Sequence, residues 1–87
     1  MYIKKTVHQM EIESYQRAHE EILIVHEIND QYIEVENFIK NTHYFVKRED
    51  GYITDCTCPY HTFRNIICKH QVAVSENTGI PILQSLL

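Results

Sequence analysis

The sequence has no hydrophobic run long enough to cross a membrane. Its longest uninterrupted aliphatic run covers residues 22–25, whereas a membrane-spanning helix needs about 20 apolar residues. Lys4 and Lys5 lie near the start of the chain, but no apolar stretch follows them that could act as a signal peptide. We therefore expect a cytoplasmic protein with no membrane partner, in a compartment that keeps thiols reduced.

A surplus of positive charge is also missing. The chain has eight basic and twelve acidic residues and a net charge of −4, so as a whole it attracts nucleic acid only weakly. The imbalance belongs to residues 1–37, with three basic and eight acidic side chains, whereas residues 38–87 have five and four. A solvated acidic face accounts for this distribution, and an acidic surface for a basic partner is the alternative interpretation.

Cysteine is scarce and odd in number, since the 87 residues include only three. A disulfide framework therefore cannot pair every thiol. We predict one small domain, residues 1–87, for which a hydrophobic core alone leaves a thin margin of stability. Clustered cysteines in a reducing compartment favour a bound metal as the additional source of stability.

The pattern of apolar residues predicts an α+β fold that begins with a helix. Residues 6–9 (T-V-H-Q) have the form of a capping box, and the helix is expected to end near Glu21. Its apolar stripe is interrupted by Glu11 and Ser14. The stripe comprises Val7, Met10, Tyr15, Ala18 and Ile22.

From Ile22 onward the hydrophobic period changes to two, and turn residues separate four short runs rich in Ile, Val, Tyr and Phe. Asp50-Gly51 is typical of a tight hairpin turn. We therefore predict a small antiparallel β-sheet. Its strands are expected at Leu23–Ile28, Tyr32–Phe38, His43–Arg48 and Tyr52–Cys56.

A short helix is predicted next, ending near Glu76 after Val72 and Ala73 have faced the core. Residues 77–79 (N-T-G), followed by Pro81, form a helix-stop pattern. The tail, residues 80–87, is unusually apolar, and we expect it to fold back onto the domain. A homodimer formed through this tail is the alternative.

The cysteines and one histidine form the pattern C-x-C-x9-C-x-H, and their side chains make a complete tetrahedral set for zinc with no position left for water. Such closure is typical of a structural site. We predict one structural Zn²⁺ per chain. Its ligands are Cys56, Cys58, Cys68 and His70.

The spacing of the ligands constrains the local structure. Residues two apart in an extended segment point to the same side, so Cys56 and Cys58 can converge from the end of a strand. Two such residues lie about 200° apart on a helix, so Cys68 must precede the helix and His70 must lie in its first turn. The result is a zinc-stabilised ββα unit. His61 is a competing candidate, but we favour His70 because C-K-H brings two ligands to one helix entry.

A catalytic role for the thiols has little support in the pattern. Cys58 and His61 could form a thiol–imidazole pair, but no oxyanion-hole loop or orienting third group is identifiable. A redox pair of Cys56 and Cys58 leaves the third cysteine and the histidine unexplained. We therefore expect a protein that is not an enzyme.

These residues resemble the SWIM zinc-finger family, whose pattern is C-x-C, a variable loop and C-x-H. Residues 52–61 resemble its strand and first ligand pair, and residues 67–74 resemble its second pair and helix, with specific similarity over residues 43–76. Small free-standing archaeal members are similar in their C-x-C-P-x-H start. The resemblance implies a zinc-binding module that contacts protein or DNA.

We expect a protein-interaction adaptor, with DNA or RNA binding as the alternative. Zinc bound by three thiolates carries a charge of −1, which makes the protein more negative and disfavours nucleic acid. Nucleic acid binding would need the basic side chains of residues 38–87 to cluster on one face. The candidates are Lys47, Arg48, Arg64 and Lys69.

Overall fold

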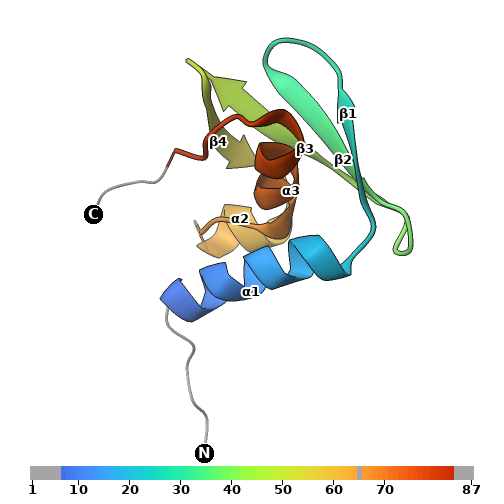
Figure 1. Cartoon of the computed structure of the whole chain (residues 1–87), viewed down its shortest axis with the longest axis vertical. Coiled ribbons are helices and arrows are strands. Elements are labelled where there is room, and N and C mark those ends of the chain that lie inside the picture. Colours follow the sequence, from blue (N-terminus) through green and yellow to red (C-terminus); the bar gives the residue numbers. More distant parts are fainter. Residues whose placement is uncertain (1–6, 65, 84–87) are drawn as a thin grey trace, which may run out of the picture.

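The computed structural model describes residues 7–64 and 66–83. Over these residues the chain forms three helices and a four-stranded antiparallel sheet (Figure 1), which is the predicted α+β class. The helices are α1 (Val7–Glu20), α2 (Pro59–Arg64) and α3 (Lys69–Thr78). The strands are β1 (Leu23–Glu27), β2 (Tyr32–Asn37), β3 (Thr42–Glu49) and β4 (Tyr52–Cys56).

The sheet is a meander with the strand order β1-β2-β3-β4, because every connection within it is short enough to pair neighbouring strands. All four predicted strands are present, with ends that shift by one residue at most. The predicted hairpin turn is confirmed by positive φ angles of 51° at Asp50 and 82° at Gly51, the conformation that Asp-Gly favours.

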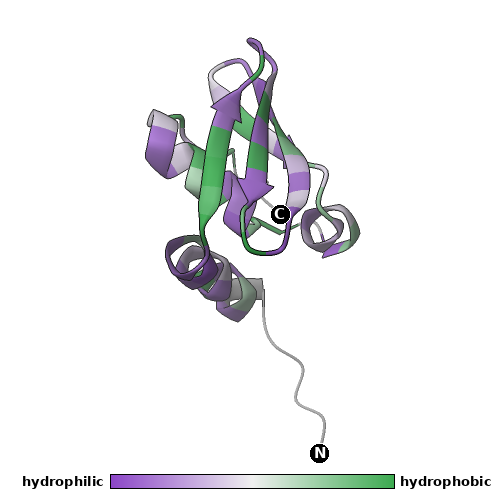
Figure 2. Cartoon of the chain, turned by 90° about the vertical axis from the view of Figure 1, so that its right-hand side faces the viewer, coloured by the Kyte–Doolittle hydropathy of each residue, from purple (hydrophilic) through white to green (hydrophobic). Residues whose placement is uncertain are grey.

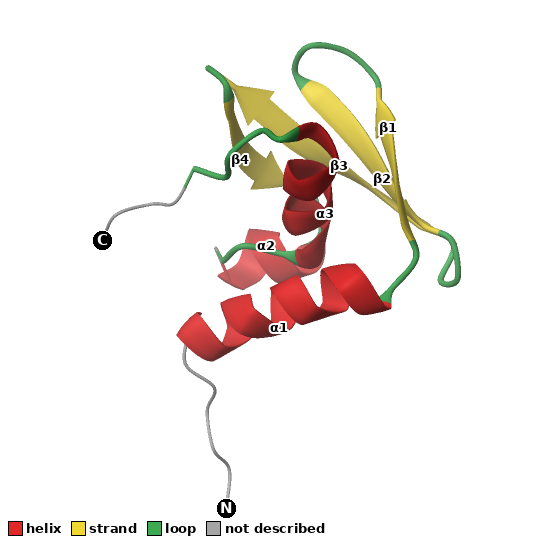
Figure 3. Cartoon of the chain, viewed as in Figure 1, coloured by secondary structure: helices red, strands yellow, loops and turns green. Residues whose placement is uncertain are grey.

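The hydrophobic core lies between one face of the sheet and α3, which packs against all four strands (Figure 3). Buried positions alternate with more exposed ones along β2, and β1 changes from hydrophobic to hydrophilic along its length (Figure 2). From α3, Val72 and Val74 are fully buried and Ala73 is 6% exposed. The prediction that Val72 and Ala73 face the core is therefore confirmed.

Helix α1 packs against α3 and not directly over the sheet. The predicted apolar stripe is correct only in part. Met10 and Ala18 are half-buried, and the side chain of Val7 lies outside what the structure describes. The predictions for Tyr15 and Ile22 are wrong, since these residues are 44% and 53% exposed, whereas Ser14 is 2% exposed. A small side chain suits a close helix–helix contact, and the Ser14 hydroxyl donates to the Met10 carbonyl at 3.1 Å, so its burial leaves no unpaired donor. Thr6 of the predicted capping box lies outside the described residues.

The sequence pattern implies a loop between the two ligand pairs, but residues 59–64 of this segment form the helix α2. Pro59 occupies the first helical position, where its missing N–H costs no hydrogen bond. The Thr62 N–H donates to the Cys58 carbonyl at 3.0 Å and closes the first turn. Because α2 has only six residues, it is too short to show the apolar periodicity that predicts a helix from sequence.

The described part of the tail folds back onto the domain as predicted. Ile82 forms a parallel bridge with Ile53 of β4, where the Ile53 N–H donates to Pro81 and the Leu83 N–H donates to Ile53, both at 2.9 Å. The backbone groups at the outer edge of β4 are thereby partly paired. Residues 84–87, part of the predicted dimer seam, lie outside the described residues. None of the described helices is long and apolar enough to cross a membrane.

Helix α3 ends two residues later than predicted, at Thr78, and Gly79 caps it with a φ of 78°. The Gly79 N–H donates to the Ser75 carbonyl at 2.8 Å. Nothing lies within 4 Å of a Cβ added at this position, so only the left-handed backbone limits substitution. The cap therefore needs glycine for its conformation and not for space.

Replacing Gly79 by alanine should lower the free energy of unfolding by about 1 kcal/mol, because an L-residue with a Cβ is strained at positive φ. Urea denaturation of the zinc-loaded protein measures the change. Gly79→Asn is the control, since asparagine tolerates the left-handed region better, and it should lose less. Equal losses in the two variants would contradict this account of the cap.

Candidate metal centre

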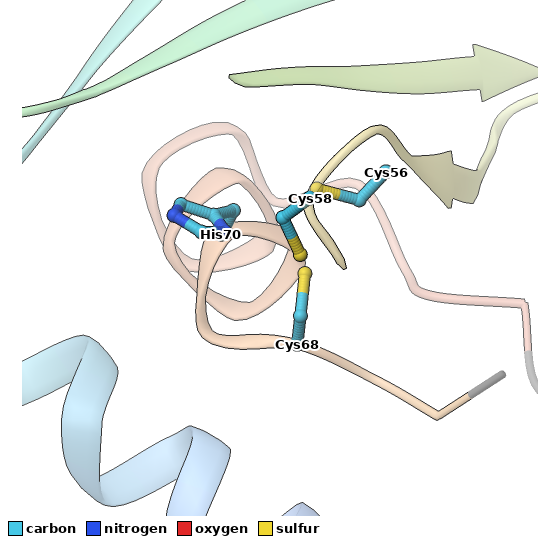
Figure 4. A group of neighbouring side chains, drawn as sticks. All are labelled: Cys56, Cys58, Cys68 and His70. Carbon is cyan, nitrogen blue, oxygen red and sulfur yellow. The ribbon is translucent and has the colours of Figure 1, made fainter. Parts of the chain in front are cut away.

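Three thiols and one imidazole meet at the junction of β4 and α3 (Figure 4). Their ligand atoms all lie within 4.8 Å of one another, and all four residues are buried. The sulfur atoms of Cys58 and Cys68 point toward each other in Figure 4, with His70 beside them. The residues are Cys56, Cys58, Cys68 and His70.

Each ligand is positioned by the end of an element. Cys56 is the last residue of β4, and Cys58 follows two residues later, immediately before α2. Between them, Thr57 ties this turn to β3 twice, since its N–H donates to the Phe45 carbonyl and its hydroxyl accepts from the Phe45 N–H, both at 2.9 Å. Sequence reasoning missed this role of Thr57, because the partner lies on another strand.

The second ligand pair has the predicted relation to its helix. Cys68 is the N-cap residue of α3, with an extended backbone, and His70 lies in the first turn. Gln71 completes a capping box, in which its side-chain oxygen accepts from the Cys68 N–H at 3.1 Å and its own N–H donates to the Cys68 sulfur. The sulfur of Cys68 therefore lies at the positive end of the helix dipole.

The surroundings of Cys58 favour negative charge on its sulfur. Hydrogen bonds with Cys58 and Cys68 and burial instead raise the pKa of Cys56, and at Cys68 the hydrogen bond from Cys56 lowers the pKa but is outweighed by the hydrogen bond with Cys58 and by burial, so this pKa is also raised. The His61 N–H donates to the Cys58 sulfur at 3.5 Å. Hydrogen bonds from the thiols of Cys56 and Cys68 hold the pKa of Cys58 well below its ordinary value. Because zinc binds thiolates and not thiols, the remaining thiols must lose their protons as the metal binds.

His70 provides an independent test of whether the cluster suits a metal. Its Nδ1 is buried and has no hydrogen-bond partner in the described part of the chain. A buried, unpaired nitrogen is costly unless a ligand satisfies it. Three sulfurs and this imidazole therefore fit one structural zinc ion with tetrahedral coordination.

The fold and this closed set of ligands define a small zinc-stabilised domain. Residues 42–79 match the family model of the SWIM zinc finger, so the resemblance inferred from the sequence is confirmed over this segment. The match includes both ligand pairs, β3, β4 and α3. Searches of curated proteins and of solved structures gave no significant match.

His61, the competing candidate, lies outside the cluster and has other partners. Its Nδ1 contacts the Ile66 carbonyl at 2.8 Å, and its Nε2 lies 3.3 Å from the Asp55 carboxylate. These contacts join α2, the following loop and the end of β4. His61 therefore stabilises the loop that connects the two ligand pairs.

The four basic candidates for nucleic acid contact each have an intramolecular contact. Lys47 lies 3.7 Å from Glu49, and Arg48 donates from its guanidinium to backbone carbonyls of the β1–β2 turn at 2.9 and 3.2 Å. Arg64 lies over the Tyr60 ring at 5.8 Å. Lys69 pairs with Glu21. Arg48 and Lys69 are therefore already committed to structural contacts.

Glu21 is a residue whose role the sequence did not reveal. It accepts from Lys69 at 2.7 and 2.8 Å and from the buried Asn37 amide at 2.8 Å. Partial burial acts to raise the pKa of Glu21, but hydrogen bonds from Lys69 and Asn37 and the nearby charges of Lys69 and Lys40 outweigh it and lower the pKa. Since Lys69 lies between two ligands, Glu21 connects the metal centre to the end of α1.

Replacing His61 by alanine should leave one zinc per chain, because neither of its ring nitrogens belongs to the ligand set. Replacing His70 by alanine should greatly weaken zinc binding, because it removes one of four ligands. Metal analysis after competition with a chelator compares the two variants directly. Loss of zinc from His61→Ala with retention in His70→Ala would reverse the assignment.

Replacing Glu21 by glutamine should lower the free energy of unfolding at pH 7 by about 1–2 kcal/mol, because the half-buried ammonium of Lys69 loses its charged partner. The lowered pKa means that this stabilisation is present above the ordinary glutamate pKa and is lost as the carboxylate becomes protonated. Denaturation of the zinc-loaded proteins measures it. Glu20→Gln, the same change at the exposed neighbouring position, should have little effect, and equal losses would contradict this role of Glu21.

Proposed function

We propose that the protein is a non-enzymatic zinc-binding module that acts as a protein-interaction adaptor. The ligand set is closed, so the metal has no position for a substrate, and its role is to join β4 to α3. The interaction role is supported by a cluster of exposed apolar side chains at the end of the sheet next to α1. We call this cluster the apolar corner. It comprises Ile22, Phe38 and Ile39.

The apolar corner is formed by the register of β1 and β2. The Phe38 N–H donates to the Ile22 carbonyl at 3.1 Å, so these residues are opposite each other and their side chains share one face. Ile22 is 53%, Phe38 62% and Ile39 71% exposed. Contiguous exposed apolar side chains on a small domain favour a binding site.

Charge at the apolar corner favours a basic partner. A hollow beside Ile22 and Ile39 is lined by Glu20, Glu21 and Lys40. Glu21 is already paired with Lys69 and Lys40, so Glu20 is the carboxylate left for a partner. Glu20 is exposed, and the protein as a whole is acidic. An apolar segment flanked by Lys or Arg would bury its apolar side chains against the corner and complement this charge.

DNA or RNA binding has less support, because Arg48 and Lys69 are engaged by carbonyls and by Glu21. A nucleic acid would have to displace the carbonyls from Arg48, and at Lys69 it would share an ammonium group that Glu21 already contacts. Zinc bound by three thiolates adds a further negative charge.

A photo-cross-linking amino acid in place of Ile39 should form an adduct with a protein in cells, through a peptide that has apolar residues flanked by Lys or Arg. The same amino acid in place of Phe63 is the control, because Phe63 is 85% exposed on α2 and lies outside the apolar corner. Adding Ile22→Asp should abolish the adduct from position 39. Nuclease-sensitive adducts, or equal adducts from both positions, would contradict the proposal.

A further inference from the structure

A cleft of about 180 Å³ lies between α1, the β2–β3 turn and the start of α3, and three of the metal ligands, Cys58, Cys68 and His70, form part of its wall. Three cationic side chains line it, one from each of these elements: Arg17, Lys40 and Lys69. No aspartate or glutamate lines it. In a protein of net charge −4, three cations from three elements at one cleft are a marked local departure from the overall charge.

The two lysines share one carboxylate. Lys69 lies 2.7 Å and Lys40 lies 3.5 Å from the same oxygen of Glu21. Two ammonium groups are therefore held close together by a single negative charge. Glu21 limits the movement of both side chains and leaves one positive charge unbalanced.

Arg17 adds a further charge from the same face of α1. It is three residues after Ser14, which also lines the cleft, and four residues before Glu21. Its exposed guanidinium has no hydrogen bond or ion pair with any residue that the structure describes. With zinc bound, the −1 charge of the metal centre offsets one of the two surplus positive charges, so the cleft keeps a positive balance.

The cleft also has neutral donors. Thr42 and Tyr44 line it, and their hydroxyl groups make no hydrogen bond within residues 7–64 and 66–83. The Tyr44 ring packs against the ligand His70, with ring centroids 5.0 Å apart, which places this wall directly beside the metal centre. A guanidinium, two ammonium groups and hydroxyl donors together match a group with several acceptor oxygens.

We propose that this cleft binds the phosphate group of a ligand. A phosphate has enough oxygens to accept two hydrogen bonds from the planar guanidinium of Arg17 and to contact both lysine ammonium groups at the same time. A single carboxylate, with two oxygens, does not. The source of the phosphate is either a small phosphomonoester or the diester backbone of a nucleic acid strand, since both present the same oxygens. The site shares Lys40 with the hollow at the apolar corner, but it does not depend on the adaptor role.

The test is NMR titration of the zinc-loaded full chain with inorganic phosphate, thymidine 5′-monophosphate and a short oligothymidylate that lacks terminal phosphates. At least one should shift the backbone amides of residues 17, 40 and 69. Arg17→Gln should weaken that binding about tenfold, the loss expected for one charge-assisted hydrogen bond. Arg17 is exposed, so this variant should keep its zinc.

Arg64→Gln is the matched control, because it makes the same change at an exposed position that does not line the cleft, and it should leave the affinity unchanged. Tighter binding of the monophosphate identifies a phosphomonoester, and tighter binding of the oligothymidylate through the same amides identifies a diester backbone. The proposal is overturned if no probe shifts these amides, if Arg17→Gln binds as wild type does, if Arg64→Gln weakens binding equally, or if acetate binds as tightly as phosphate.

Discussion

Four ligand atoms from two ends of the ββα unit must converge within 4.8 Å, and most of the structure depends on this requirement. Cys56 and Cys58 follow the end of β4, whereas Cys68 and His70 open α3, so their convergence places α3 across the sheet. That helix then covers the face from which the core is formed. Structural zinc supplies on the order of 10–16 kcal/mol of apparent binding free energy, comparable to the whole stability of a small domain.

The position of α1 depends indirectly on the metal centre. Lys69 lies between two ligands, and its ammonium pairs with Glu21, which follows the last turn of α1. Glu21 also holds the buried Asn37 of β2, so one carboxylate connects α1, α3 and the sheet. The position of the metal ligands is thus coupled to that of α1, and the face of α1 that meets α3 also lines the cleft beside the metal.

The surface shows why net charge says little about local chemistry. The chain is acidic as a whole, yet a cleft lined by Arg17, Lys40 and Lys69 has no aspartate or glutamate in its wall. These residues are far apart in the sequence and lie on three elements, so no linear charge pattern could reveal them together. The apolar corner has the same origin, since Ile22 and Phe38 become neighbours only through the pairing of β1 with β2.

Features that local chemistry controls could be predicted from the amino-acid sequence. These are the strands, the Asp50-Gly51 turn, the Gly79 cap and the placement of Cys68 before α3, because each depends on residues within a few positions. Tertiary structure alone decided that α1 buries Ser14 instead of Tyr15, because α1 meets another helix at close range and not the sheet. It also decided the pairing of Glu21 with Lys69, since contacts between distant residues depend on how the elements pack and leave no local pattern in the chain.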